Sequence, residues 1–228
     1  MPALKFLCAL LLSVVAVGGV AQAATPNYPE GKFYTTINNP LPPPDPGKIA
    51  VQEFFWYGCP HCFHLDPLLN AWIPKLAKDV SFEHVPDNLG QALGKLHERA
   101  YYVATSLGIE HKIHTPLFDA IQVQRLPMNN KADLQAFFEK TAGVTAQQFD
   151  SAWNSFEVDS GMRRADQLAL HDRILATPTL VIAGQYRVQE GLPGYMAMKV
   201  PEVDRFKVML KVADYLIDKV RKDRAAGK

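Results

Sequence analysis

The chain has 228 residues, 48% of them hydrophobic, and its 24 lysines and arginines are balanced by 23 aspartates and glutamates. A formal net charge of +1, without a run of like charges, argues against a nucleic-acid-binding surface. The length suffices for one well-packed core, or for one domain with a sizeable insertion.

The first 23 residues have the pattern of a cleaved export signal. Lys5 supplies a positive start, residues 6–20 form an uncharged apolar run, and Ala21-Gln22-Ala23 fits the small-residue cleavage pattern. The apolar run is shorter than the roughly 20 residues of a membrane-spanning helix, so a membrane anchor is the less favoured alternative. We expect cleavage after Ala23 and export of the mature protein.

Cysteine usage points to chemistry rather than to scaffolding. Cys8 lies inside the signal, so the mature protein keeps only Cys59 and Cys62, which form a single C-x-x-C motif. Exported proteins commonly use disulfides to tie distant segments together, and this pair cannot do so. We therefore interpret the motif as a redox-active dithiol.

The segment around the cysteines is expected to run strand, helix, strand. Residues 24–48 are rich in proline and predict an extended arm with a short edge strand near 33–36. Residues 49–56 are apolar on both faces apart from two positions, which is typical of a central strand. A helix should follow over 59–77, with Pro60 in its first turn, and then a strand over 80–85.

A block of helices is expected from 88 to 165. The apolar spacing from Leu89 to Leu107 is that of one helix face. A short helix should start at Thr115-Pro116, and another should be capped by Asn130 and stop near Gly143. Thr145 and Gln148 form a capping box for a helix with Phe149, Trp153 and Phe156 on one face, and a last helix is expected over 160–173.

The remaining residues predict a return to the sheet. A strand over 179–183, a two-residue turn at Gly184-Gln185 and a partner strand over 186–189 form a hairpin. A last helix carries apolar residues from Phe206 to Val220, and we expect its basic end from Arg221 to fray. The domains are thus predicted as 24–87 with 166–228 for the α/β unit and 88–165 for the insertion.

The cysteines are expected to have different roles. Cys59 would lie at the N-terminus of the helix, where unpaired N–H groups and the helix dipole stabilise a thiolate. His61 can add a positive charge or a donor there. A thiolate of a client protein, the protein to be oxidised, would attack Cys59 and form a mixed disulfide. Cys62 would be the resolving thiol that re-forms the internal disulfide.

Three other uses of the motif fit less well. Covalent haem attachment needs a histidine after the second cysteine, and Phe63 stands there. A zinc site from Cys59, Cys62 and His64 would need a fourth ligand from elsewhere. A purely structural disulfide across so small a ring would restrict the unfolded chain little. We therefore expect no metal, and no cofactor besides the cysteine pair.

Two further positions are candidates for the site. Glu53 is a carboxylate in an otherwise apolar strand; it is either a proton acceptor for Cys62, or it pairs with a lysine or reaches water. Thr177-Pro178 precedes the strand over 179–183, and from physics alone this peptide bond would be trans.

Three motifs in this order resemble the DsbA family of periplasmic thiol oxidases. They are F-F-W-Y-G-C-P-H-C at 54–62, D-S-A-W-N-S-F at 150–156 and A-T-P-T-L-V-I at 176–182. The resemblance implies an α/β thioredoxin fold with an inserted all-helical domain. It also implies oxidation of reduced secreted proteins by a periplasmic monomer, and reoxidation by a DsbB-like, quinone-linked membrane protein.

The resemblance assigns roles to individual residues as well. The Thr177–Pro178 bond should be cis and lie beside Cys59, with the backbone of Thr177 presented to an extended client. His61 should stabilise the thiolate, and Glu53 occupies the place of the family's buried acid. No lysine lies in 80–85 to pair with that acid, and His84 is the nearest candidate.

The expected client contacts are Trp56, Thr177, Pro178, Met196 and Met198. The two methionines would form an adaptable rim of the groove, or fill the core instead.

Two alternative functions remain open. The same fold could serve a thiol reductase or disulfide isomerase, although a DsbC-type isomerase needs an N-terminal dimerisation domain that residues 24–48 are too few to form. The second alternative is a client-binding chaperone that uses the groove without turnover.

Overall fold

The computed structural model describes residues 27–43 and 45–227. The predicted signal and its cleavage site at Ala23 lie outside these residues. Within the described part of the chain, no helix is both long and apolar enough to cross a membrane.

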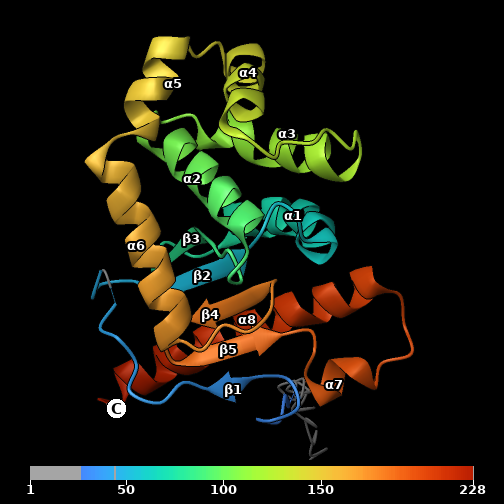
Figure 1. Ribbon diagram of the computed structural model, residues 1–228. Coiled ribbons are helices and arrows are strands. Elements are labelled where there is room, and N and C mark those ends of the chain that lie inside the picture. Colours follow the sequence, from blue (N-terminus) through green and yellow to red (C-terminus); the bar gives the residue numbers. More distant parts are fainter. Residues whose placement is uncertain (1–26, 44, 228) are drawn as a thin grey trace, which may run out of the picture.

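The chain begins in a sheet, continues into a block of helices and then returns to the sheet (Figure 1). The strands are β1 (Thr35–Thr36), β2 (Ile49–Phe55), β3 (Val80–Pro86), β4 (Thr179–Ile182) and β5 (Tyr186–Gln189). The helices are α1 (Pro60–Trp72), the 3-10 helix η1 (Ile73–Lys75), α2 (Ala92–Ser106), α3 (Glu110–Gln122), α4 (Lys131–Ala142), α5 (Ala146–Trp153), α6 (Phe156–His171), α7 (Pro193–Met196) and α8 (Glu202–Ala225).

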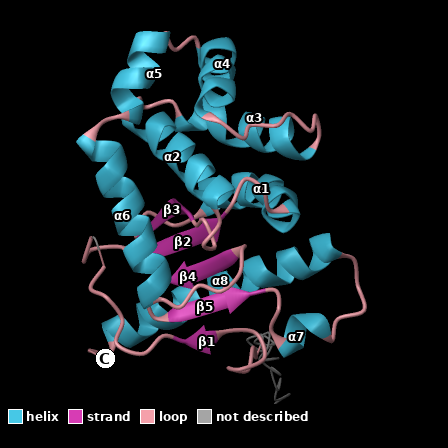
Figure 2. Cartoon of the chain, viewed as in Figure 1, coloured by secondary structure: helices cyan, strands magenta, loops and turns pink. Residues whose placement is uncertain are grey.

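The five strands form one mixed sheet in the order β1-β5-β4-β2-β3 (Figure 2). Strand β2 pairs in parallel with β3 and antiparallel with β4, and β5 pairs antiparallel with both β4 and β1. The β2–α1–β3 crossover, the β4–β5 hairpin and the final helix α8 define a thioredoxin fold. The block from α2 to α6 is inserted between β3 and β4, as predicted.

Strand β2 is buried because apolar side chains cover both faces of the sheet. Phe54 and Phe55 belong to a core that the sheet shares with the inserted helices, and this core also contains Cys59 and Cys62. Val51 belongs to a second core, which contains apolar residues of α8 such as Phe206 and Leu216. The dithiol thus lies where the inserted helices meet the sheet.

Helix caps in the inserted block follow local sequence signals. The Asn130 side chain accepts a hydrogen bond from the Asp133 N–H, and Gly143 ends α4 in the left-handed conformation at φ 70°. Thr145 and Gln148 form the predicted reciprocal capping box. Figure 1 shows α2–α5 gathered at one end of the molecule. The boundary predicted at 165 lies inside α6, which continues alongside the sheet.

Two helix starts in this block differ from the prediction. Helix α3 begins at Glu110, and Pro116 lies in its interior. Thr115 does not cap a helix, because its hydroxyl donates instead to Asp66 Oδ2 at 2.9 Å. Likewise α2 begins at Ala92 rather than at Leu89, whose φ of 47° is incompatible with a right-handed helix.

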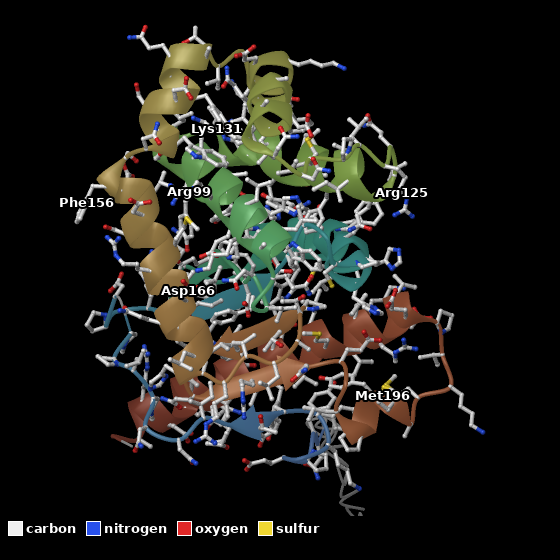
Figure 3. All side chains as sticks on the ribbon, in the orientation of Figure 1. Arg99, Arg125, Lys131, Phe156, Asp166 and Met196 are labelled. Carbon is white, nitrogen blue, oxygen red and sulfur yellow. The ribbon has the colours of Figure 1, made fainter. Side chains whose placement is uncertain are left out.

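The predicted position of Phe156 was also wrong. Phe149 and Trp153 stack on α5 as expected, but Phe156 is the first residue of α6 and is 81% exposed. Figure 3 shows its ring pointing away from the helices. The Ser155 hydroxyl accepts from the Val158 N–H, so this cap starts a new helix before Phe156 can join the α5 face.

The hairpin turn and the chain end are corrected too. The β4–β5 turn has three residues, with Ala183 at φ 54° and Gly184 at φ 66°. Helix α8 continues to Ala225 and does not fray at Arg221, whose guanidinium pairs with Asp79 at 2.7 Å and with Asp218. The pair with Asp218 lies within α8, whereas the pair with Asp79 joins residues 142 apart, which the apolar periodicity could not indicate.

Candidate active site

The two cysteines occupy the junction of β2 and α1. Cys59 is the N-cap of α1, with extended backbone at φ −88° and ψ 115°, and Pro60 follows in the first turn. The missing N–H of the proline costs nothing at this position, because the first amides of a helix have no partner in the helix. Cys62 is one turn further and fully buried, and the two sulfurs are not joined by a disulfide in the structure.

The surroundings separate the pKa values of the two thiols. The pKa of Cys59 is lowered to about 6, mainly by a hydrogen bond from the Cys62 thiol. Burial opposes this shift, while further hydrogen bonds with Thr177 and with the backbone of Cys62 and His61 add to it. Burial raises the pKa of Cys62 well above its usual value. Cys59 is therefore the thiol that ionises, and Cys62 keeps its proton.

The Thr177–Pro178 segment lies against Cys59. Its peptide bond is cis, as the family resemblance implied and as physics alone did not. The Cys59 thiol donates to the Thr177 carbonyl at 3.3 Å, so two segments 118 residues apart meet at this sulfur.

The imidazole of His61 points to acidic residues beyond the motif. Its Nδ1 atom hydrogen-bonds to Glu202 Oε1 at the start of α8, and it lies 3.8 Å from Glu190 Oε2. His64 Nδ1 lies 2.5 Å from the other oxygen of Glu202. Burial opposes the charged form, yet the hydrogen bond and charge of Glu202 raise the pKa of His61, as does the charge of Cys59.

Glu53 has the partner that the sequence suggested. Its side chain is 2% exposed, and its Oε2 lies 2.6 Å from Nδ1 of His84 on the neighbouring strand. Burial disfavours the charged imidazole, but the hydrogen bond and charge of Glu53 raise the pKa of His84. The charge of Glu53 also acts on Cys62, where it adds to the effect of burial.

A buried polar cluster continues from this pair and was not anticipated. The His84 ring lies 4.2 Å from the ring of His114, centroid to centroid. His114 Nδ1 lies 3.0 Å from the Tyr57 hydroxyl, and its Nε2 lies 3.4 Å from Asp66 Oδ1. The histidines come from β3 and α3, so no sequence spacing could have indicated their contact.

Trp56 lies beside the motif and packs against the shared core. Its indole N–H donates to His97 Nδ1 at 3.2 Å. Gly58 lets this ring pack against the backbone, since a Cβ at position 58 would lie 2.3 Å from the Trp56 ring.

The two methionines of the predicted rim differ from each other. Met196 lies on α7 and is 69% exposed (Figure 3). Met198 is partly buried and packs against the core beneath α8. The core against which Met198 packs is a different one from the core that contains Cys59 and Cys62.

Two groups of side chains in the described residues bring potential metal ligands within 4.8 Å of one another. One is His84, Glu110 and His114 in the interior, and the other is His61, Glu190 and Glu202 beside the motif. Neither includes a cysteine, so the zinc site considered from Cys59, Cys62 and His64 is not the arrangement found.

A cysteine pair at the N-terminus of α1, beside a cis-proline loop on a thioredoxin sheet, defines a thioredoxin-fold thiol:disulfide oxidoreductase. The model of the DSBA-like thioredoxin domain family matches residues 69–207. The chain is 36% identical to the thiol:disulfide interchange protein DsbA of Pseudomonas aeruginosa over 218 residues, 96% of each chain. It is also 36% identical to DsbA of Pseudomonas syringae pv. tomato, over 96% of this chain and 95% of that protein.

Solved structures agree with these relatives. The crystal structure of Pseudomonas aeruginosa DsbA matches with a TM-score of 0.76 at 35% identity, over 88% of this chain and 97% of that one. DsbA from Xylella fastidiosa matches with a TM-score of 0.74 at 33% identity, over 87% of this chain and 99% of that one. The chain belongs to the DsbA-like thioredoxin family and is an oxidoreductase of thiols and disulfides.

Proposed function

We propose that the protein is a periplasmic dithiol oxidase that donates the Cys59–Cys62 disulfide to reduced secreted proteins. The observation that carries this proposal is the opposite tuning of the two thiols. Cys59, with its pKa lowered to about 6, is a good leaving group, whereas buried Cys62 is a poor nucleophile at neutral pH.

The reaction proceeds in two exchanges. A client thiolate attacks Cys59, forming a client–Cys59 bond as the internal disulfide breaks, and Cys62 takes up a proton. A second client thiolate then attacks the client sulfur of this mixed disulfide, and Cys59 leaves as a thiolate. The client loses two electrons and gains a disulfide, while the cysteine pair is reduced.

Several residues support these steps in the proposal. Glu53, with His84 beside it, exchanges the proton of Cys62, because its charge acts on this thiol. His61 and the backbone at the start of α1 stabilise the Cys59 thiolate. The Thr177–Pro178 loop receives an extended client strand next to Cys59, and Trp56, Met196 and Met198 line the client surface.

The direction of transfer separates this function from its alternatives. A reductase or isomerase needs Cys62 to attack a mixed disulfide readily, and the raised pKa of Cys62 opposes that step. A chaperone would use the groove without the cysteines. The cycle we propose is closed by a DsbB-like, quinone-linked membrane protein that reoxidises the pair. The protein is proposed to act as a monomer, after removal of residues 1–23, and its exchange steps use the cysteine pair without a metal or other cofactor.

The equilibrium with glutathione tests the proposal directly. We expect the disulfide to be reduced at glutathione ratios that leave ordinary structural disulfides intact, because the Cys59 thiolate stabilises the reduced form. Cys59→Ala should abolish oxidation of a reduced model protein. A disulfide that resists glutathione would indicate a reductase, and activity retained in Cys59→Ala would reject the mechanism.

A further inference from the structure

Four potential metal ligands from three segments converge beside the dithiol. His61 and His64 are three residues apart on α1, so their side chains lie on one face of the helix. Glu202 opens α8, and Glu190 follows β5. His61, Glu190 and Glu202 bring potential ligand atoms within 4.8 Å of one another, and His64 is joined to this group through its contact with Glu202.

The donor atoms of this group suit a zinc-type ion. Both histidines turn Nδ1 toward the same carboxylate, with His64 Nδ1 2.5 Å from Glu202 Oε2. His61 Nδ1 lies 3.8 Å from Glu190 Oε2. Ligand atoms around a tetrahedral zinc ion are about 3.4 Å apart, given bonds of about 2.0–2.1 Å, so small side-chain rotations would open the group around one ion.

Nitrogen and carboxylate ligands together select the class of ion. Two imidazoles favour zinc and neighbouring transition metals over calcium or magnesium, which prefer oxygen. Arg205 binds Oε1 of Glu190 at 2.6 Å, which leaves Oε2 directed at His61 and holds the carboxylate in place. Outer contacts of this kind orient the ligands of protein metal sites.

The position is accessible, unlike the second group of possible ligands. The side chains of His61 and His64 are 56% and 52% exposed, so an ion can enter from solvent. In the interior group, Nδ1 of His84 is already bonded to Glu53, and His114 is buried. We propose that His61, His64, Glu190 and Glu202 form a binding site beside the Cys59–Cys62 dithiol. The site would bind zinc or a similar divalent transition-metal ion.

This proposal does not depend on the direction of thiol–disulfide transfer. Binding should therefore be measured on the oxidised protein, in which Cys59 and Cys62 are joined and cannot act as thiolate ligands. Titration of zinc chloride by calorimetry should show one equivalent bound. His64→Ala and Glu202→Gln should each weaken the affinity at least tenfold.

Two control variants locate the ion. His111→Ala removes an exposed histidine elsewhere on the surface, and Glu110→Gln removes a ligand of the interior group. Both should bind zinc like the unmodified protein. Circular dichroism of every variant checks that a loss of binding is not a loss of folding. His64→Gln repeats the test with a smaller change in shape.

Nuclear magnetic resonance gives a second readout. Added zinc should shift the imidazole signals of His61 and His64 and leave that of His111 in place. Absence of binding to the oxidised protein would overturn the proposal. So would zinc binding that persists in both His64→Ala and Glu202→Gln, or that is lost in Glu110→Gln.

Discussion

Nδ1 of His84 lies 2.6 Å from Oε2 of Glu53, and the two residues are direct neighbours across the parallel strands β2 and β3. The Glu53 side chain is 2% exposed and the His84 side chain 12% exposed, and the charge of Glu53 raises the pKa of Cys62. A buried carboxylate is retained only when it is paired or when it serves in proton transfer. The pair therefore joins β2 to β3 and also affects the pKa of Cys62.

Removing only the histidine should be more harmful than removing both partners. His84→Phe leaves Glu53 buried without its partner, and we expect a loss of about 3–5 kcal/mol in the free energy of unfolding at pH 7. The double variant Glu53→Gln, His84→Phe should recover most of this loss. Urea unfolding measures both values. The deficit of the single variant should shrink at lower pH, because protonation removes the unpaired charge; a double variant no more stable than the single one contradicts this coupling.

The reactivity of Cys59 should persist at mildly acidic pH. With the pKa lowered to about 6, the thiolate is half populated near pH 6 instead of near the ordinary value of 9.0. The rate of iodoacetamide alkylation of the reduced protein should therefore rise to half its plateau near pH 6. Cys59→Ala is the control that identifies the reacting thiol, and a midpoint near pH 9 would be inconsistent with the site described here.

The same lowered pKa predicts how the stability of the reduced protein depends on pH. A depressed folded-state pKa stabilises the protein fully above the unfolded-state pKa near 9, and this contribution is lost as the pH falls through about 6. At 1.36 kcal/mol per pKa unit it amounts to about 4 kcal/mol. The free energy of unfolding should be measured for the reduced and the oxidised protein from about pH 5 to about pH 9. Only the reduced protein should show this pH-dependent contribution.

Glu202 should control the protonation of His61. Its hydrogen bond and charge raise the pKa of the imidazole, so Glu202→Gln should lower that pKa. A pH titration followed by nuclear magnetic resonance, with a chelator present to remove metal ions, measures the change. His111 serves as the internal reference. If the titration of His61 is the same in both proteins, the contact between α1 and α8 does not govern its charge.

Gly58→Ala tests the packing behind the motif. The new Cβ would lie 2.3 Å from the Trp56 ring, so the ring must move and give up its hydrogen bond to His97. We expect a loss of about 1–3 kcal/mol from this overpacking, and a change in tryptophan fluorescence. Gly191→Ala is a matched control, because no atom lies within 4 Å of its added Cβ. Equal stability of the two variants would contradict the assigned contact.

Cys62→Ala tests the division of roles between the thiols. Cys59 remains reactive in this variant, while no neighbouring thiol can release a bound client. Mixed disulfides between Cys59 and client proteins should therefore accumulate and be visible on non-reducing gels. Disappearance of these adducts in a Cys59→Ala, Cys62→Ala double variant confirms the attachment point. Failure to trap any client would favour a protein that binds without exchange.

Local signals in the chain predicted most individual elements. The apolar run before Cys59 becomes β2, the capping residues Asn130 and Thr145 start their helices, and the hairpin β4–β5 forms where the strand pattern turns. Such features need only neighbours along the chain. Local signals failed where a distant partner competed, as at Thr115, whose hydroxyl binds Asp66 on α1 instead of capping a helix.

The sequence by itself determined where the redox motif lies, because the cysteine spacing, the proline after Cys59 and the strand before it are all local features of one short segment. Only the tertiary structure decided what surrounds the motif. Glu202 reaches His61 from 141 residues away, and Thr177 reaches Cys59 from 118. These contacts depend on how α8 and the β4 loop pack against α1, which no local pattern encodes. The cysteine pair is a property of the sequence, whereas the difference between its two pKa values is a property of the fold.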